Sequence, residues 1–284
     1  MTRKAKDNLA LEYDEAALAE RDALVAVETD DQILERLDQR FEILKQMTLA
    51  VKQGAMRGMI VSGPPGVGKS HGVEEVLLRQ NLFNQIADRD PNYEVVKGTL
   101  SSVGLYAKLH DYKEAGDVLV FDDADNIFFD MLSLNLLKAA LDSSKKRVLS
   151  WNTDSRLLRG EGIPNQFEFK GSVIFITNIK FSMVKSKTLK EHLTALESRC
   201  HYIDLEMDTQ REKLLRIKQI VGQGMLKDYH FNDGVSDDIL NFIDLYKDKL
   251  RELSLRMVLK LADLYKSFPS NWEAMAENTC MVRK

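Results

Sequence analysis

The chain has 284 residues, of which 44% are hydrophobic and 30% are charged, a balance typical of a globular protein with a sizeable core. The formal net charge is −4, so no overall basic field favours sequence-independent binding of nucleic acid, although local basic patches remain compatible with it. Two distant cysteines and five scattered histidines form neither a disulfide framework nor a metal-ligand spacing, so we expect a reducing compartment and no structural metal.

The amino-terminal segment, residues 1–30, is polar and rich in Ala, Glu and Asp, which predicts a flexible or partly helical arm. It contains no apolar stretch of the kind found in signal peptides. No run in the chain approaches the roughly 18 apolar residues that a membrane span needs. We therefore expect a cytoplasmic protein with no membrane partner.

Apolar residues recur at helical spacing between residues 33 and 51, which predicts one long amphipathic helix. Five short apolar runs alternate with helical patterns after it and predict strands at residues 59–61, 93–96, 118–121, 173–176 and 202–205. The third and fourth runs are continuously apolar, as expected of parallel strands covered on both faces. Residues 31–207 are thus predicted to form an α/β domain with a doubly wound parallel sheet.

The strand patterns stop after Asp208. Helical patterns then cover residues 209–226, 237–248, 253–267 and 270–280, with breaks around Gly234 and Pro269. Residues 208–284 are therefore predicted to form a small, all-helical second domain.

A glycine-rich segment between the first strand and the next helix matches the pattern G-x-x-x-x-G-K-[ST]. Glycines let the backbone curl around phosphates, and the exposed N–H groups and the helix N-terminus attract phosphate oxygens. Lys69 is expected to reach the β- and γ-phosphates, and Ser70 to ligate Mg²⁺. A chance match in a chain of this length has a probability of about one in a hundred. The predicted nucleotide-binding residues are Gly63, Pro64, Pro65, Gly66, Val67, Gly68, Lys69, Ser70 and His71.

Polar residues end the third and fourth predicted strands. Asp122 is expected to hold the Mg²⁺ shell, and Asp123 to orient or deprotonate the attacking water. Asp125 is interpreted as the N-cap of the following helix. Asn178 alone would be a turn residue, but its place after the other two motifs favours a role between the γ-phosphate and the water.

In this order the motifs resemble those of the AAA+ ATPase family over residues 33–268. Walker A lies at residues 63–70, Walker B at 118–123 and sensor 1 at Asn178. Ala-Leu-Glu-Ser-Arg-Cys at residues 195–200 resembles the arginine-finger motif of clamp-loader subunits. The resemblance implies that Arg199 touches the γ-phosphate bound by a neighbouring subunit, the alternative being a cation that faces the helix dipole.

The resemblance also implies an AAA+ domain followed by a helical lid, ATP and Mg²⁺ as cofactors, and a ring-shaped homo-oligomer. A hexamer is the expected ring, with a pentamer as the alternative. Arg256 resembles sensor 2 at the start of a lid helix, and Arg251 competes with it for that role. Most family members have Glu where this chain has Asp123, which is one methylene shorter, so the speed of hydrolysis stays open. Replication initiators of the DnaA type also carry Asp-Asp at this place.

Two segments are candidates to face a central channel. Leu105 and Tyr106 resemble a substrate-gripping pore loop, with packing in the core as the alternative. Residues 145–151 and 167–169 flank a loop with Arg156 and Arg159, and together they resemble a pre-sensor-1 hairpin. Basic residues with an aromatic suit a single-stranded nucleic-acid channel, and they suit a solvated hairpin equally well.

The resulting hypothesis is an AAA+ ATPase that hydrolyses Mg·ATP at subunit interfaces to remodel a macromolecule in DNA replication or other DNA transactions. One alternative is a protein-remodelling chaperone of the MoxR-like kind, which would grip its substrate with Tyr106. Another is a superfamily-3-like helicase, against which the helical lid counts. A nucleotide switch without hydrolysis is a further possibility if Asp123 cannot activate water. The compact architecture resembles that of AAA+ proteins encoded by bacteriophages.

Overall fold

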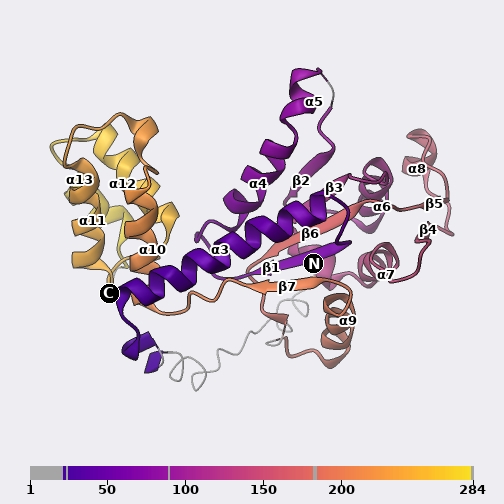
Figure 1. Ribbon diagram of the computed structural model, residues 1–284, viewed down its shortest axis with the longest axis horizontal. Helices are drawn as coiled ribbons and strands as arrows, with labels where there is room; N and C mark the ends of the chain where they lie inside the picture. The colour runs from indigo at the N-terminus through magenta and orange to yellow at the C-terminus, as the bar shows by residue number, and fades with distance from the viewer. Residues whose placement is uncertain (1–21, 24, 89, 182–183, 283–284) are drawn as a thin grey trace. The chain divides into compact units, whose positions relative to one another are not determined.

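The computed structural model describes residues 22–23, 25–88, 90–181 and 184–282 (Figure 1). Most of the arm predicted at residues 1–30 lies outside them. Their contacts divide the described residues into two compact units. The first unit comprises residues 41–63 and 69–205, and the second comprises residues 64–68, those from 206 onward and the described residues up to 40. No helix in the described part of the chain has the length and apolar character to cross a bilayer.

Five parallel strands form the central sheet of the first unit in the order β2-β3-β6-β1-β7. Every residue of the three strands β1, β3 and β6 is buried, which is why the middle of each strand is an unbroken apolar run. The parallel sheet predicted from the sequence is confirmed, and the carboxyl ends of all five strands share one edge. The strands are β1 (Gly58–Ser62), β2 (Tyr93–Lys97), β3 (Val118–Asp122), β6 (Ser172–Thr177) and β7 (His201–Asp204).

Helices cover both faces of this sheet, as a doubly wound fold requires. Helices α6 (Ser102–Asp111), α7 (Met131–Ala140) and α9 (Lys187–Glu197) share one core with Phe121 and Phe175, whose rings stack with their centroids 5.7 Å apart. Alternate strand residues point to the opposite face. There α3 (Asp30–Lys52) and α4 (Lys69–Gln80) pack closely, and α4 continues into α5 (Leu82–Ile86) as an arm that stands out from the sheet (Figure 1).

The hairpin predicted before the fourth core strand is confirmed. Strands β4 (Val148–Ser150) and β5 (Gln166–Glu168) pair antiparallel, and the loop between them contains α8 (Arg156–Gly160). Arg147 does not belong to the exposed basic surface, because its side chain is buried, donates to the carbonyl oxygen of Ala140 at 2.8 Å and lies over the ring of Phe169. Burial lowers the pKa of Arg147 to about 10.

The second unit is helical, as the patterns after Asp208 predict. Its core joins the apolar faces of the four α-helices that follow Asp208, around Phe242 and Trp272. Glu212 is fully buried and closes a capping box with Thr209, and it also accepts a hydrogen bond from Arg36 at 3.0 Å. The helices are α10 (Gln210–Gly222), α11 (Val235–Tyr246), α12 (Leu255–Ser267) and α13 (Trp272–Cys280), with a 3-10 turn at Lys227–Tyr229.

Candidate nucleotide site

The Walker A segment joins the end of β1 to the start of α4. Gly66 and Gly68 have φ angles of 71° and 101°, a backbone conformation that residues with a Cβ rarely adopt. A Cβ added to Gly66 would also come within 2.7 Å of the Ser254 Cβ atom. The φ angles explain why glycine stands at both places, and the closeness of Ser254 is a second reason at Gly66.

Lys69 lies at the first position of α4 with its side chain buried. Its ammonium group donates to the carbonyl oxygen of Gly63 at 2.7 Å and to Oδ1 of Asn178 at 2.6 Å. A buried cation at the amino end of a helix strengthens the positive field that the helix dipole already provides there. The place therefore favours an anionic group such as a phosphate.

Asp122 ends β3 and is buried. The hydroxyl of Ser70 donates to its Oδ1 atom at 2.9 Å. Magnesium sites in nucleotide-binding proteins take one or two protein oxygens and fill the remaining positions with phosphate and water. A hydroxyl and a carboxylate in contact fit that donor set, so Ser70 and Asp122 would hold the Mg²⁺ that accompanies a nucleotide.

Asp123 and Asn178 face each other across the ends of two strands, β3 and β6. The amide of Asn178 donates to Oδ1 of Asp123 at 2.9 Å, and its oxygen accepts from Lys69. Asp123 has a φ angle of 53°, which is uncommon for a residue other than glycine, and its N–H donates to the carbonyl oxygen of Ile176. Lys69, Asn178 and Asp123 thus form one hydrogen-bonded series at the carboxyl edge of the sheet.

Asp125 has a different role from the helix cap expected of it. The 3-10 helix that follows, Asp125–Phe129, begins after Ala124 without any side-chain cap. The carboxylate of Asp125 instead accepts a hydrogen bond from the hydroxyl of Thr177 at 2.7 Å, and burial raises the pKa of Asp125. The N-cap prediction was wrong because the chain turns Asp125 inward, where it ties the ends of β3 and β6 together.

Lys97, at the end of β2, is a further polar residue of this edge that was not predicted from the sequence. Parallel pairing sets Lys97 directly beside Asp122, and its ammonium nitrogen lies 3.3 Å from Oδ2 of that carboxylate. The same nitrogen lies 3.0 Å from Oε1 of Glu74 on α4. The sequence holds one signal for this residue, a polar side chain at the carboxyl end of a core strand, but only the register of the sheet pairs it with Asp122.

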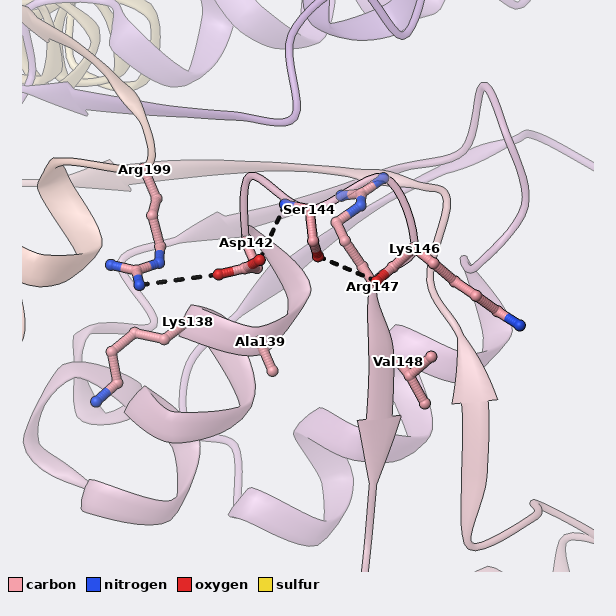
Figure 2. Close-up of a pocket in the computed structure, with 8 residues that line it drawn as sticks. All are labelled: Lys138, Ala139, Asp142, Ser144, Lys146, Arg147, Val148 and Arg199. Atoms are coloured by element: carbon pink, nitrogen blue, oxygen red, sulfur yellow. Dashed lines mark hydrogen bonds and ion pairs between the residues drawn. The ribbon is translucent and has the colours of Figure 1, made fainter.

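Arg199 follows the end of α9 and lines a pocket of the first unit. Its guanidinium group donates to the carbonyl oxygen of Ala195 at 2.6 Å and lies 3.9 Å from the carboxylate of Asp142. Figure 2 shows Arg199 and Asp142 at an open pocket of about 520 Å³, whose other lining residues include Lys138, Ser144 and Lys146. The contact with Ala195 matches the helix-end alternative, and no Walker residue lines this pocket.

Arg256 belongs to the second unit, together with residues 64–68 of the Walker A loop. The N–H of Leu255 donates to the carbonyl oxygen of Gly66 at 2.9 Å, so the start of α12 lies against that loop. The exposed Arg256 is the second residue of the helix, whereas the backbone of Arg251 bonds to Cys280. His71 is exposed at the third position of α4, and its role in nucleotide binding stays a prediction.

The Leu105–Tyr106 pair is fully buried and cannot serve as an exposed grip. Tyr106 donates its hydroxyl to the carbonyl oxygen of Pro164 at 2.9 Å and packs against the rings of Trp151 and Phe167. The pore-loop interpretation of these two residues was wrong, because α6 turns them under the hairpin.

We expect Tyr106→Ala to lower the free energy of unfolding by about 3–5 kcal/mol, as for other large buried aromatics. Tyr106→Phe removes only the hydroxyl, so it should cost about 1 kcal/mol. Urea denaturation of the two variants measures the difference. Unchanged stability of Tyr106→Ala, together with a selective loss of substrate processing, would contradict the burial argument.

No protein-family model matches the chain. The chain is 34% identical over 244 residues to an uncharacterized 36.7 kDa protein from the nrdC–mobD intergenic region of Enterobacteria phage T4, a match that covers 85% of this chain and 73% of that protein. A solved structure of the replication initiator DnaA bound to AMPPCP and single-stranded DNA is similar with a TM-score of 0.48, at 12% identity over 84% of this chain and 63% of its own. Domain III of the Thermotoga maritima replication initiation protein DnaA has a TM-score of 0.47, at 12% identity over 85% of this chain and 92% of its own.

The strand order, the Walker A segment after β1 and the helical second unit define a P-loop fold of the AAA+ type. Within that class, the chain belongs to the same family as the 36.7 kDa protein of phage T4.

Proposed function

We propose that this chain is an ATPase that binds Mg·ATP at residues 63–70 and hydrolyses it. The observation that carries the proposal is the convergence of two hydrogen-bonded sets at one edge of the sheet. The first set is Lys69, Asn178 and Asp123, and the second is Ser70 and Asp122. The first set offers a cation and a carboxylate that is held by an amide. The second set offers a hydroxyl and a carboxylate, two oxygen ligands suited to Mg²⁺.

Each residue then has a distinct task. Lys69 binds the β- and γ-phosphate oxygens, and the backbone N–H groups of the glycine loop orient them. Asn178 holds the carboxylate of Asp123, which accepts a proton from the attacking water. Bound Mg²⁺ supplies positive charge against the phosphates. The strained backbone of Asp123 supports this role, because such conformations persist mainly where surrounding contacts enforce them.

The proposed site is completed by a second copy of the chain. Arg199 lines a pocket apart from the Walker residues, so it would serve a nucleotide bound by a neighbouring subunit in a homo-oligomeric ring. Arg256 would approach the phosphates of its own subunit from α12, which lies against Gly66. Both arginines are cations that would stabilise the negative charge of the transferred phosphoryl group.

We further propose that the ATPase acts on DNA, as in replication. Around the hairpin Lys145, Lys146, Arg156 and Arg159 are exposed, and these cations suit phosphates, although Arg159 pairs with Asp154 at 3.1 Å. The buried Tyr106 removes the observation that favoured a protein substrate. The steady-state rate of ATP hydrolysis, measured alone and with single-stranded DNA, double-stranded DNA or RNA, tests both parts. No hydrolysis under any condition would contradict the ATPase, and a rate indifferent to nucleic acid would contradict the DNA substrate.

We expect the double variant Arg156→Ala with Arg159→Ala to weaken single-stranded DNA binding and to abolish its stimulation of hydrolysis. Each lost phosphate contact should flatten the slope of log affinity against log salt by about 0.7, so by about 1.4 for two. Fluorescence anisotropy over a salt series measures this slope. The double variant Lys187→Ala with Lys227→Ala removes two exposed cations outside the hairpin and is the charge-matched control. Equal slopes for the two double variants would contradict a role of the hairpin.

A further inference from the structure

Lys97 and Asp122 form an ion pair in the place where the metal would bind. The Lys97 ammonium nitrogen lies 3.3 Å from Oδ2 of Asp122, while Oδ1 of the same carboxylate accepts from the Ser70 hydroxyl. Both carboxylate oxygens are therefore engaged by groups of this chain. Since β2 and β3 pair in register at these residues, the backbone holds the two side chains next to each other.

The two partners differ in how freely they can move. Asp122 is buried, and a buried carboxylate needs compensating charge. The Lys97 side chain is 60% exposed and has a flexible stem, so its ammonium group can leave the carboxylate with little loss of packing. A divalent ion on Ser70 and Asp122 would place two positive charges within a few ångströms of this ammonium group and repel it strongly. Lys97 and the metal would therefore compete for Asp122.

Glu74 supplies the place to which Lys97 can move. Its Oε1 atom lies 3.0 Å from the Lys97 ammonium nitrogen, and it projects from α4, one turn beyond Ser70. Lys97 now contacts both carboxylates, and a metal on Asp122 would leave it with Glu74 alone. After this change of partner Lys97 would pair with Glu74 and the metal with Asp122, so each carboxylate would keep a positive partner.

We propose that Lys97 is a positioning residue that holds Asp122 in place of the metal and makes metal binding depend on nucleotide. A free divalent ion must displace the ammonium group at the expense of an ion pair, whereas an ion that arrives with a nucleotide brings phosphate oxygens that offset the repulsion. The inference rests on the function proposed above and adds a residue outside the Walker motifs to it.

Titration with Mn²⁺, followed by electron paramagnetic resonance of the free ion, tests the proposal without any measurement of hydrolysis. In the absence of nucleotide, Lys97→Gln should bind Mn²⁺ about tenfold more tightly than the unaltered chain, because a nearby positive charge is gone. Lys97→Arg keeps that charge and should bind like the unaltered chain. Glu74→Gln removes the alternative partner of Lys97 and should bind Mn²⁺ more weakly than the unaltered chain.

Lys45→Gln is the matched control, since Lys45 pairs at 3.0 Å with Glu75, the neighbour of Glu74 on the same helix. It should leave the Mn²⁺ affinity unchanged. With ADP present, the difference between Lys97→Gln and the unaltered chain should shrink, because the phosphates then contribute to the site. Equal nucleotide-free binding by Lys97→Gln and the unaltered chain, including none by either, would overturn the proposal.

Parallel binding of ATP separates this inference from the function on which it rests. If the unaltered chain binds Mn·ATP and Lys97→Gln shows no gain for free Mn²⁺, the role of Lys97 falls and the ATPase proposal stands. If the unaltered chain binds neither ATP nor Mn·ATP, both proposals fall.

Discussion

Arg199→Ala is expected to leave nucleotide binding unchanged while it lowers ATP turnover by about 10³-fold or more, the range measured for arginines that complete a site from a neighbouring subunit. Within its own chain the Arg199 guanidinium group donates to the carbonyl oxygen of Ala195 and lies 3.9 Å from the carboxylate of Asp142, and half-exposed ion pairs of this kind add little stability. The loss should therefore appear in turnover and leave the fold intact. Steady-state hydrolysis and equilibrium binding of a fluorescent ATP analogue measure the two quantities separately.

Mixed oligomers sharpen this test. Asp123→Asn subunits lack the proposed base but keep Arg199, and Arg199→Ala subunits lack the arginine but keep Asp123. A mixture forms interfaces where one subunit supplies the base and its neighbour supplies the arginine, so part of the turnover should return. Arg79→Ala, an exposed arginine whose pair with Glu75 lies on one helix, is the control and should retain full turnover. Absence of any recovery in the mixture would argue against a shared site.

Lys69→Ala is expected to weaken ATP binding by about 100-fold or more, because truncation of one member of a buried, charge-assisted contact costs about 2–5 kcal/mol. The Lys69 ammonium group is buried beside the start of α4, and Lys69 is the one cationic residue among residues 63–70. Isothermal titration calorimetry with ATP and ADP measures the loss. It should be larger for ATP, since we propose that Lys69 also reaches the γ-phosphate.

Lys69→Met separates charge from packing at the same place, because it keeps an unbranched chain of similar length in the buried position. It should lose affinity as Lys69→Ala does and should keep more of the stability. Lys45→Ala removes a half-exposed lysine of the first unit and should bind ATP normally. Tight binding of ATP by either Lys69 variant would refute the assignment of residues 63–70 as the phosphate loop.

The central strands and the loop that follows β1 could be predicted because their signals are local. Parallel strands covered on both faces need unbroken apolar runs, and a backbone that turns around phosphates needs glycine at particular positions. The same holds for the β4–β5 hairpin, whose alternating pattern is visible without knowledge of its surroundings. These features follow from the chain's own periodicity.

The errors concern side chains whose environment comes from distant segments. Tyr106 and Arg147 are of residue types that often grip a substrate at a surface, yet both are buried in the folded chain. Asp125 has the identity and position of a helix cap, yet Thr177, 52 residues further along, takes its carboxylate. In each case the residue type allows two uses, and the choice depends on which partner the folded chain brings near.

Residue types and spacing alone thus specify the sheet, the helical segments after it and the candidate phosphate loop, because backbone preference and burial on a regular element act over a few neighbouring residues. The pairing of Lys97 with Asp122, the series from Lys69 through Asn178 to Asp123, and the inward turn of Asp125 depend on strand order and register. Strand order and register are set when the whole sheet packs, because pairing between strands decides which strand ends lie next to one another.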